Sequence, residues 1–184
     1  ISNTIIMMHS NKSSCNINKT YITSKMKSNK ENRVKTIFYS ICIVLTDQIS
    51  KHLVLILLGF DKSKNIIPNL LNFTLVKNEG AAFSLFSNSS NILAITSLIA
   101  SLLLVSIVLK YPRISYWNLT GLTYLLGGTV GNGIDRFLKG YVLDFINLVP
   151  INFPIFNIAD MAINIAIICF IIDIIKTKDK TKIK

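Results

Sequence analysis

Four long apolar segments dominate the hydrophobic pattern of this chain, at residues 37–60, 91–109, 116–135 and 155–175. Each has about the 20 residues that a helix needs to cross the roughly 30 Å hydrocarbon core of a bilayer. The connections between the segments and the two chain ends carry most of the charged residues. The pattern therefore predicts an all-α membrane protein with four transmembrane helices.

The segments outside these apolar runs differ in character. Residues 61–90 include Asn72–Val76, which is rich in β-branched and aromatic residues, and the turn signal Asn78-Glu79-Gly80. We expect a small extracytoplasmic β-element there, resting at the membrane surface. Residues 1–35 are polar and basic without a helical apolar stripe, which predicts a disordered amino-terminal arm. Residues 177–184 form a basic tail.

The net charge of +11 is unevenly distributed along the chain. Fourteen Lys and Arg residues lie in 12–35, 110–113 and 176–184, whereas the remaining connections contain five: Lys62, Lys64, Lys77, Arg136 and Lys139. Because basic residues accumulate on the cytoplasmic side of a membrane protein, both termini are expected in the cytoplasm. The basic residues at the chain ends have no aromatic residues interleaved with them, so no nucleic-acid partner is expected.

The cysteine and histidine content does not point to a bound cofactor. Cys15, Cys42 and Cys169 have neither metal nor disulfide spacing, and His9 and His52 lie far apart. We interpret the cysteines as small packing residues. The sequence therefore predicts no metal and no cofactor.

Two polar clusters interrupt the first and third apolar segments. Asp47 and Lys51 are four residues apart, so they share a helix face and can form an ion pair. This pair is either purely structural or supports a nearby site. The third segment is rich in glycine, which favours close helix packing in lipid, and it ends in a polar cluster that contains Asn132, Asp135 and Arg136. Arg136 either neutralises Asp135 or holds a substrate carbonyl or a lipid headgroup.

Two further carboxylates, Asp144 and Asp160, lie where the chain enters and leaves apolar sequence. An ionisable residue at membrane depth is costly and is by default a candidate for function. Asp160 shares an expected inward-facing helical stripe with Asn157 and Asn164, and the positive end of the helix dipole favours its ionised form. Apolar neighbours surround Asp144, so desolvation is expected to raise its pKa. Environments that separate the pKa values of two carboxylates in this way make one carboxyl the acid and the other the base.

The residues alone leave two other classes of function open. A small transporter or proton-relay protein also uses intramembrane carboxylates, although the sequence has no repeated halves. A non-enzymatic scaffold would use its acids only to pair with Lys51 and Arg136. That alternative leaves Asp144 and Asp160 without partners.

Five stretches, in this order, resemble the lipoprotein signal peptidase family, also called signal peptidase II. They are Asp47–Lys51, Asn78–Ser84, Gly131–Arg136, Val142–Phe145 and Phe156–Asp160, and the likeness covers about residues 36–176. Departures from the family pattern are mild. One example is Leu143, which occupies a position where the family usually has valine.

The resemblance implies an intramembrane aspartyl endopeptidase that removes signal peptides from diacylglyceryl-modified bacterial prolipoproteins, cleaving before the lipidated cysteine. It implies a four-helix membrane bundle with a small extracytoplasmic β-cradle, so that residues 36–176 form the peptidase domain. The implied catalytic dyad is Asp144 and Asp160, and the residues implied to line or support the pocket are Asn78, Gly80, Asn132, Arg136, Asn157, Asp47, Lys51 and Asp135. We expect a monomer in the bacterial inner membrane, with prolipoproteins and membrane lipids as partners and the active site near the outer face.

Overall fold

The computed structural model describes residues 2–60, 62–80, 90–110, 114–151 and 153–182. The chain divides into two compact units, Ile1–Lys35 and Thr36–Lys184. The elements follow in the order α1, β1, β2, α2, α3, β3 and α4. The structure is therefore mostly helical, with a small sheet.

The first unit consists of the amino-terminal part of helix α1, which begins at Ser2 and ends at Leu58. Residues 1–35 contain neither proline nor glycine, so nothing in this sequence interrupts helical hydrogen bonding. The structure therefore differs from the disordered arm that was expected over residues 1–35.

The second unit contains the rest of α1 together with α2 (Ser90–Lys110), α3 (Tyr116–Lys139) and α4 (Ile158–Lys182). Among the described residues, three helical stretches have the length and apolar composition to cross a membrane: Lys30–Leu58, Asn91–Lys110 and Ile158–Lys178. Helix α3 lies where the third crossing was expected, but it carries glycine, threonine and asparagine along its length. The composition of the helices thus supports three of the four expected crossings.

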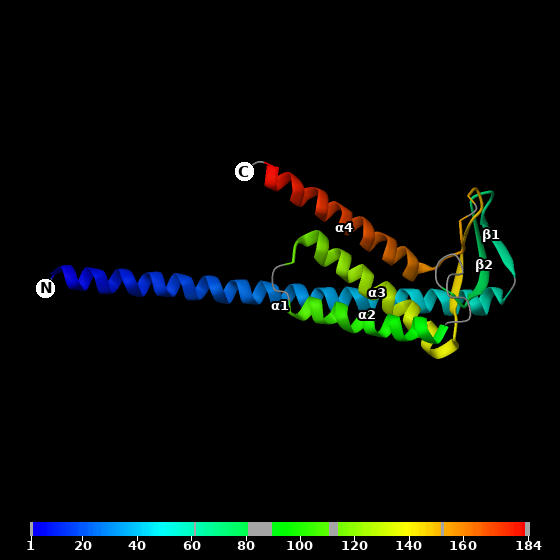
Figure 1. Cartoon of the computed structure of the whole chain (residues 1–184), viewed down its shortest axis with the longest axis horizontal. Coiled ribbons are helices and arrows are strands. Elements are labelled where there is room, and N and C mark those ends of the chain that lie inside the picture. The colour runs from blue at the N-terminus through cyan, green and yellow to red at the C-terminus, as the bar shows by residue number, and fades with distance from the viewer. Residues whose placement is uncertain (1, 61, 81–89, 111–113, 152, 183–184) are drawn as a thin grey trace. The chain divides into compact units, whose positions relative to one another are not determined.

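Helix α3 is packed closely against its neighbours. It contacts both α2 and α4 and lies between them in Figure 1. A methyl group placed on Gly127 would lie 2.8 Å from the Ile43 side chain of α1, and one on Gly128 would lie 2.5 Å from the backbone oxygen of Ala159. The glycines therefore allow close approach of the helices, as the sequence predicted.

Both ends of α3 have defined caps. The Ser115 side chain accepts a hydrogen bond from the Asn118 backbone N–H, and Gly140 ends the helix with φ 79° and donates its N–H to the Arg136 carbonyl. The Ser115 hydroxyl also donates to Asp173 of α4, and Asn118 Nδ2 donates to the same carboxylate at 2.8 Å. These bonds connect the start of α3 to the carboxyl-terminal half of α4.

A three-stranded antiparallel sheet lies at the end of the bundle where α1 ends and α4 begins (Figure 1). Its order is β1 (Ser63–Ile67), β2 (Leu71–Asn78) and β3 (Val142–Leu148). The first two strands confirm the expected β-element within residues 61–90. Strand β3 was not predicted, because it comes from the segment after α3 that was expected to be a loop. The motif residues Ala81–Ser84 lie outside the described residues.

The sheet is attached to the bundle by a small hydrophobic core. Val54 of α1 packs with Leu75 of β2 and with Leu143 and Phe145 of β3. Strand β3 therefore runs directly over the end of α1, and this packing fixes the position of the residues between Leu143 and Phe145.

Candidate active site

Asp144 lies in the middle of β3, between the two core residues of that strand, and only 2% of it is exposed. It pairs with Val76 across the β2–β3 ladder. Its two carboxylate oxygens accept hydrogen bonds from two asparagines: Oδ2 from Asn78 Nδ2 at 2.9 Å and Oδ1 from Asn157 Nδ2 at 2.6 Å. The sheet thus holds a carboxylate away from solvent with both oxygens hydrogen-bonded.

Asp160 lies in the first turn of α4, and Asn157 caps that helix. The Asn157 side chain accepts the Asp160 backbone N–H at 2.9 Å, while the Asp160 carboxylate accepts the Asn157 backbone N–H at 3.2 Å. This reciprocal arrangement is a capping box, which satisfies two backbone donors at the start of a helix. Because the side chain of Asp160 is only partly buried, it is the more accessible of the two aspartates.

Asn157 is the residue that joins the two aspartates. Its side-chain amide donates to Asp144 and its backbone N–H donates to Asp160. Asn132 of α3 completes the connection, since its Nδ2 donates to Asp160 Oδ1 at 2.8 Å and its Oδ1 accepts from Asn157 Nδ2 at 3.0 Å. The structure therefore brings together four of the predicted site residues, from β3, α3 and the start of α4.

The environment of Asp144 disfavours its charged form. Burial, together with the nearby charge of Asp160, raises the pKa of the Asp144 carboxyl to about 7. The hydrogen bonds from Asn78 and Asn157 act in the opposite direction but do not cancel the effect of burial. Near neutral pH, Asp144 is therefore able to hold a proton in a site that contains a second carboxylate.

A buried ion-pair network lies beneath the two aspartates, with Lys51 of α1 at its centre. The Lys51 ammonium is 2.8 Å from Asp47, 2.9 Å from Asp135 and 3.1 Å from Asn132 Oδ1. The predicted pairing of Asp47 with Lys51 is thus confirmed. Lys139 adds a second contact to Asp135 at 2.8 Å. Two cations and two carboxylates therefore balance, and only the Lys139 ammonium is partly exposed.

The network reaches the backbone beside each of the two site aspartates. Asp135 Oδ2 accepts the N–H of Leu143 at 3.3 Å, one residue before Asp144. Asp47 Oδ1 accepts the N–H of Ala159 at 2.9 Å, one residue before Asp160. The lysine-centred network therefore positions both segments that carry the site carboxylates.

Arg136 faces the same region from the end of α3. Its Nη2 donates to the Gly80 carbonyl at 3.3 Å, and its charge interacts with the carboxylates of Asp160, Asp144 and Asp135. The buried Nε of Arg136 has no hydrogen-bond partner among the described residues. Gly80 in turn donates its N–H to Asn78 Oδ1 at 3.1 Å, which orients the asparagine that contacts Asp144.

Some expectations for the site residues require correction. Asp135 pairs with Lys51 and Lys139, rather than with the adjacent Arg136, because successive residues on a helix point in different directions. Asn164 is exposed and does not join Asn157 and Asp160 on an inward-facing stripe. Asn157 precedes the first helical residue and acts as the cap, so it does not belong to a stripe along the helix either.

Sequence reasoning missed the contribution of Gln48 to this site. Its Nε2 lies 3.0 Å from the Gly131 carbonyl, 3.2 Å from Asp47 Oδ2 and 3.4 Å from Asp135 Oδ1. Its position next to Asp47 in an apolar segment was the available signal. Within the described part of the chain, no group of three His, Cys, Asp or Glu residues is arranged to hold a metal ion.

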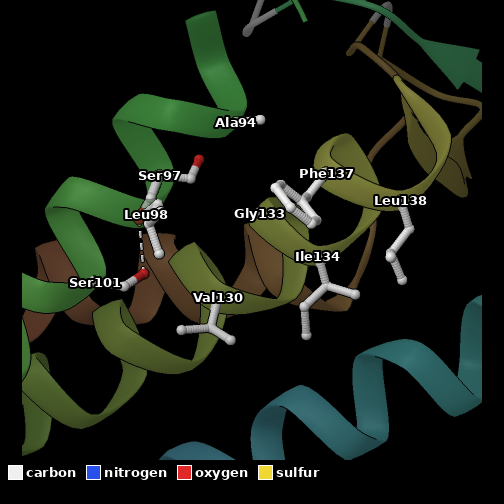
Figure 2. A pocket seen from close by; sticks show the side chains of 9 residues that line it. All are labelled: Ala94, Ser97, Leu98, Ser101, Val130, Gly133, Ile134, Phe137 and Leu138. Atoms are coloured by element: carbon white, nitrogen blue, oxygen red, sulfur yellow. Dashed lines mark hydrogen bonds between the residues drawn. The ribbon is translucent and has the colours of Figure 1, made fainter. Parts of the chain in front are cut away.

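A separate groove of about 340 Å³ lies between α2 and α3. Figure 2 shows Ser97 and Leu98 of α2 facing Val130, Gly133 and Ile134 of α3 across it. Its lining is apolar apart from two serines and contains neither Asp144 nor Asp160. The groove therefore contributes no titratable group to the site.

The model of the family described as Signal peptidase (SPase) II matches residues 39–176. The lipoprotein signal peptidase of Parasynechococcus marenigrum (strain WH8102) is 44% identical over 140 residues, which cover 76% of this chain and 88% of that protein. The lipoprotein signal peptidase of Thermosynechococcus vestitus is 52% identical over 106 residues, covering 58% of this chain and 67% of that protein.

Two solved structures, each described as a bacterial membrane enzyme structure obtained by the in meso method, have a similar fold. The structure at 2.3 Å resolution has a TM-score of 0.75 and 32% identity, and covers 82% of this chain and 93% of its own. The structure at 1.9 Å resolution has a TM-score of 0.70 and 33% identity, and covers 77% of this chain and 93% of its own. The fold is thus shared over most of both chains.

Proposed function

This chain belongs to the signal peptidase II family, and from this premise we propose that it is an intramembrane aspartyl endopeptidase. Its proposed substrates are diacylglyceryl-modified bacterial prolipoproteins, from which it removes the signal peptide by cleaving before the lipidated cysteine. The proposed catalytic residues are Asp144 and Asp160. A membrane peptidase with this pair of acids requires no cofactor.

The observation that carries the proposal is the hydrogen-bonded link between the two carboxylates through Asn157. In the described part of the chain, neither Asp144 nor Asp160 forms a salt bridge, whereas Asp47 and Asp135 share Lys51. An acid that is buried without a cationic partner contributes little to stability, which favours a chemical role. The same contrast weighs against a scaffold whose acids serve only in ion pairs.

In the proposed mechanism, Asp160 acts as general base and takes a proton from water. Asp144, whose pKa is raised by burial, acts as general acid and protonates the scissile carbonyl oxygen or the leaving amine. In the proposed active form, Asp144 carries the proton that it donates. We propose Arg136, whose Nε has no hydrogen-bond partner among the described residues, as the donor to a substrate carbonyl.

The proposed membrane arrangement has four crossings, with α3 as the third. Helix α3 can cross the membrane in this arrangement despite its polar residues, because its buried face packs inside the bundle. That face includes Gly128 and Asn132. The charge distribution supports our proposal that both termini are cytoplasmic and that the site lies near the outer face of the bacterial inner membrane. We propose that the protein acts as a monomer.

A cleavage assay with the purified protein in lipid vesicles tests the proposed function. The substrates are a prolipoprotein peptide with a diacylglyceryl-modified cysteine and the same peptide without the lipid. We expect cleavage of the lipidated peptide and a loss of rate of at least about 10³-fold in Asp144→Asn and in Asp160→Asn, since each removes one half of an acid–base pair.

The matched control is Asp173→Asn, which makes the same chemical change on α4 at a carboxylate bonded to Ser115 and Asn118, outside the site. This variant is expected to retain cleavage. Normal cleavage by either site variant rejects the dyad, and equal cleavage of both peptides rejects the proposed substrate class.

A further inference from the structure

A lysine and two aromatic rings form a contact outside the site described above. The Lys77 ammonium lies 4.7 Å from the centre of the Phe60 ring and 4.9 Å from the centre of the Tyr141 ring. The two rings meet edge to face, with centroids 6.5 Å apart. Both ring distances lie within the roughly 6 Å over which a cation is attracted to an aromatic face. We refer to these three residues as the lysine clamp.

The two rings of the lysine clamp directly follow the ends of two helices. Gly59, with φ 75°, precedes Phe60 and donates its N–H to the Leu55 carbonyl of α1. Gly140, with φ 79°, precedes Tyr141 and caps α3. Both rings also pack against the hydrophobic core that attaches the sheet to α1. Because a left-handed cap defines how the chain leaves a helix, the position of each ring is tied to a helix end.

The lysine of the clamp is next in sequence to a residue of the site. Lys77 is the next-to-last residue of β2, and the last is Asn78, which donates to the Asp144 carboxylate at 2.9 Å. Successive side chains of a strand point to opposite faces. Lys77 therefore reaches the rings from one face of the strand, and Asn78 reaches Asp144 from the other. Restraint of the lysine thus fixes the orientation of the strand end that carries the asparagine.

This end of β2 is paired with one neighbouring strand. Strand β1 pairs no further along β2 than Thr74. Strand β3 continues the ladder to Asn78, through its pair with Val142. In the described parts of the chain no carboxylate forms a salt bridge with Lys77. Strand ends open more readily than strand centres, so the contact with the rings adds a restraint where the ladder is weakest.

From this geometry we propose that Lys77 is a positioning residue for Asp144, because the lysine clamp holds the end of β2 where Asn78 can donate to that carboxylate. The consequence for catalysis rests on the proposed function, whereas the positioning itself requires no turnover. The charged groups that surround Asp144 come from the other elements of the site: Lys51 of α1, Asp135 and Arg136 of α3, and Asp160 of α4.

Titration of Asp144 by ¹³C NMR in detergent micelles tests the positioning in the absence of substrate. The seven aspartates of the chain are labelled at the carboxyl carbon, and the Asp144 resonance is identified by its loss in Asp144→Asn. Burial raises the pKa of Asp144, and the hydrogen bond from Asn78 opposes that rise. Lys77→Met loosens this bond, so we expect the titration midpoint to rise by about 0.5 pH unit, about threefold in proton affinity.

Three further variants distinguish positioning from a simple loss of charge. Tyr141→Leu keeps the lysine but removes one ring, and it is expected to raise the midpoint as Lys77→Met does. Lys77→Arg keeps a cation that stacks on aromatic rings, and it is expected to restore the wild-type midpoint. The matched control is Lys64→Met, which removes an exposed lysine of β1 that contacts no ring within the described residues. No shift is expected in this control.

A double variant tests whether the effect passes through Asn78. Asn78→Ala alone is expected to raise the midpoint, and the addition of Lys77→Met is expected to raise it no further, because the two residues act through one contact. Three results overturn the proposal: an unchanged midpoint in Lys77→Met, an unchanged midpoint in Tyr141→Leu, and additive shifts in the double variant. The Asp173 resonance, from a carboxylate bonded at the start of α3, is expected to stay at its wild-type position and reports that each variant is folded.

The cleavage assay separates this proposal from the proposed function. In an active protein, Lys77→Met is expected to move the fall in cleavage rate at high pH in the same direction as Asn78→Ala, with KM changed by less than about twofold, since the clamp does not touch substrate. A protein that shows the NMR shifts but cleaves no peptide retains the positioning role of Lys77 and loses only the peptidase assignment.

Discussion

The raised pKa of Asp144 has a consequence for stability that can be measured without any substrate. A carboxyl that binds its proton more tightly in the folded state than in the unfolded state makes the folded protein less stable as pH rises. The pKa moves from its ordinary value of 3.8 to about 7, a difference of about three units, and each unit corresponds to about 1.4 kcal/mol. Ionisation of Asp144 therefore costs the folded state about 4 kcal/mol.

The loss of stability falls in a pH window bounded by the two pKa values, 3.8 in the unfolded state and about 7 in the folded state. Below pH of about 4 the carboxyl is protonated in both states, so it adds no pH dependence. Between about 4 and 7 only the unfolded state loses the proton, and the free energy of unfolding falls as pH rises. Above about 7 both states are ionised and the full loss is present. The Asp144→Asn variant carries a neutral amide at every pH and lacks this loss.

An equilibrium unfolding titration with dodecyl sulfate in mixed micelles, followed by far-UV circular dichroism from pH 4 to 8, measures the effect. We expect wild type and Asp144→Asn to be similar at pH 4, and the variant to be more stable by about 4 kcal/mol at pH 8. Asp173→Asn is the control, and it is expected to follow the wild-type pH dependence. Parallel curves for wild type and Asp144→Asn would show that Asp144 ionises freely in the folded protein, which refutes the reasoning.

Three further predictions follow from the contacts of the site. Lys51→Met leaves two buried carboxylates without their shared cation and is expected to destabilise the protein by about 3–5 kcal/mol in the same titration. The control Lys139→Met removes a half-exposed ammonium and is expected to cost at most about 1 kcal/mol. Equal losses of stability in the two variants would contradict the network. Gly128→Ala places a methyl group against a backbone oxygen and is expected to lower the free energy of unfolding by about 1–3 kcal/mol. In the control Gly133→Ala the new methyl group meets only a side chain, so a smaller loss is expected. The reverse order of the two losses would refute the packing argument. Asn78→Ala removes a hydrogen bond that favours the ionised form of Asp144. The fall in cleavage rate at high pH is therefore expected to shift to higher pH. An unchanged pH profile would show that this hydrogen bond is not formed in the active enzyme.

The apolar spans could be located from the sequence because local composition specifies them, whereas the helical residues of α1 before Thr36 were not predicted. An apolar stretch of about 20 residues has few alternatives to a helix in lipid. Helix α2, for example, was expected over 91–109 and spans Ser90–Lys110. Strand β3 could not be located in the same way. Its partner β2 lies more than sixty residues earlier in the chain, so the pairing of Asp144 with Val76 depends on the packing of α2 and α3 between them.

The site was predicted in its residues but only partly in its contacts. The spacing of Asn157 and Asp160 indicated that they meet, yet a helical stripe and a helix cap have the same spacing of three, and only the observed start of α4 at Ile158 distinguishes them. The partner of Asp135 was open to prediction, since Lys139 follows it by four residues on one helix face. The contact with Lys51 depends instead on how α1 and α3 cross, which no local pattern encodes.

The bonds from Asp135 to Leu143 N–H and from Asp47 to Ala159 N–H tie the interior of α1 to both halves of the site through one buried cation. Ligand occupancy and local opening of the first helix are therefore thermodynamically linked: whatever restrains the two carboxylates also restrains that helix. We therefore expect a ligand that restrains both aspartates to slow amide hydrogen exchange around Lys51. Substitutions at Asp47 or Gln48 are expected to weaken the binding of such a ligand, because they loosen the support of the two aspartates.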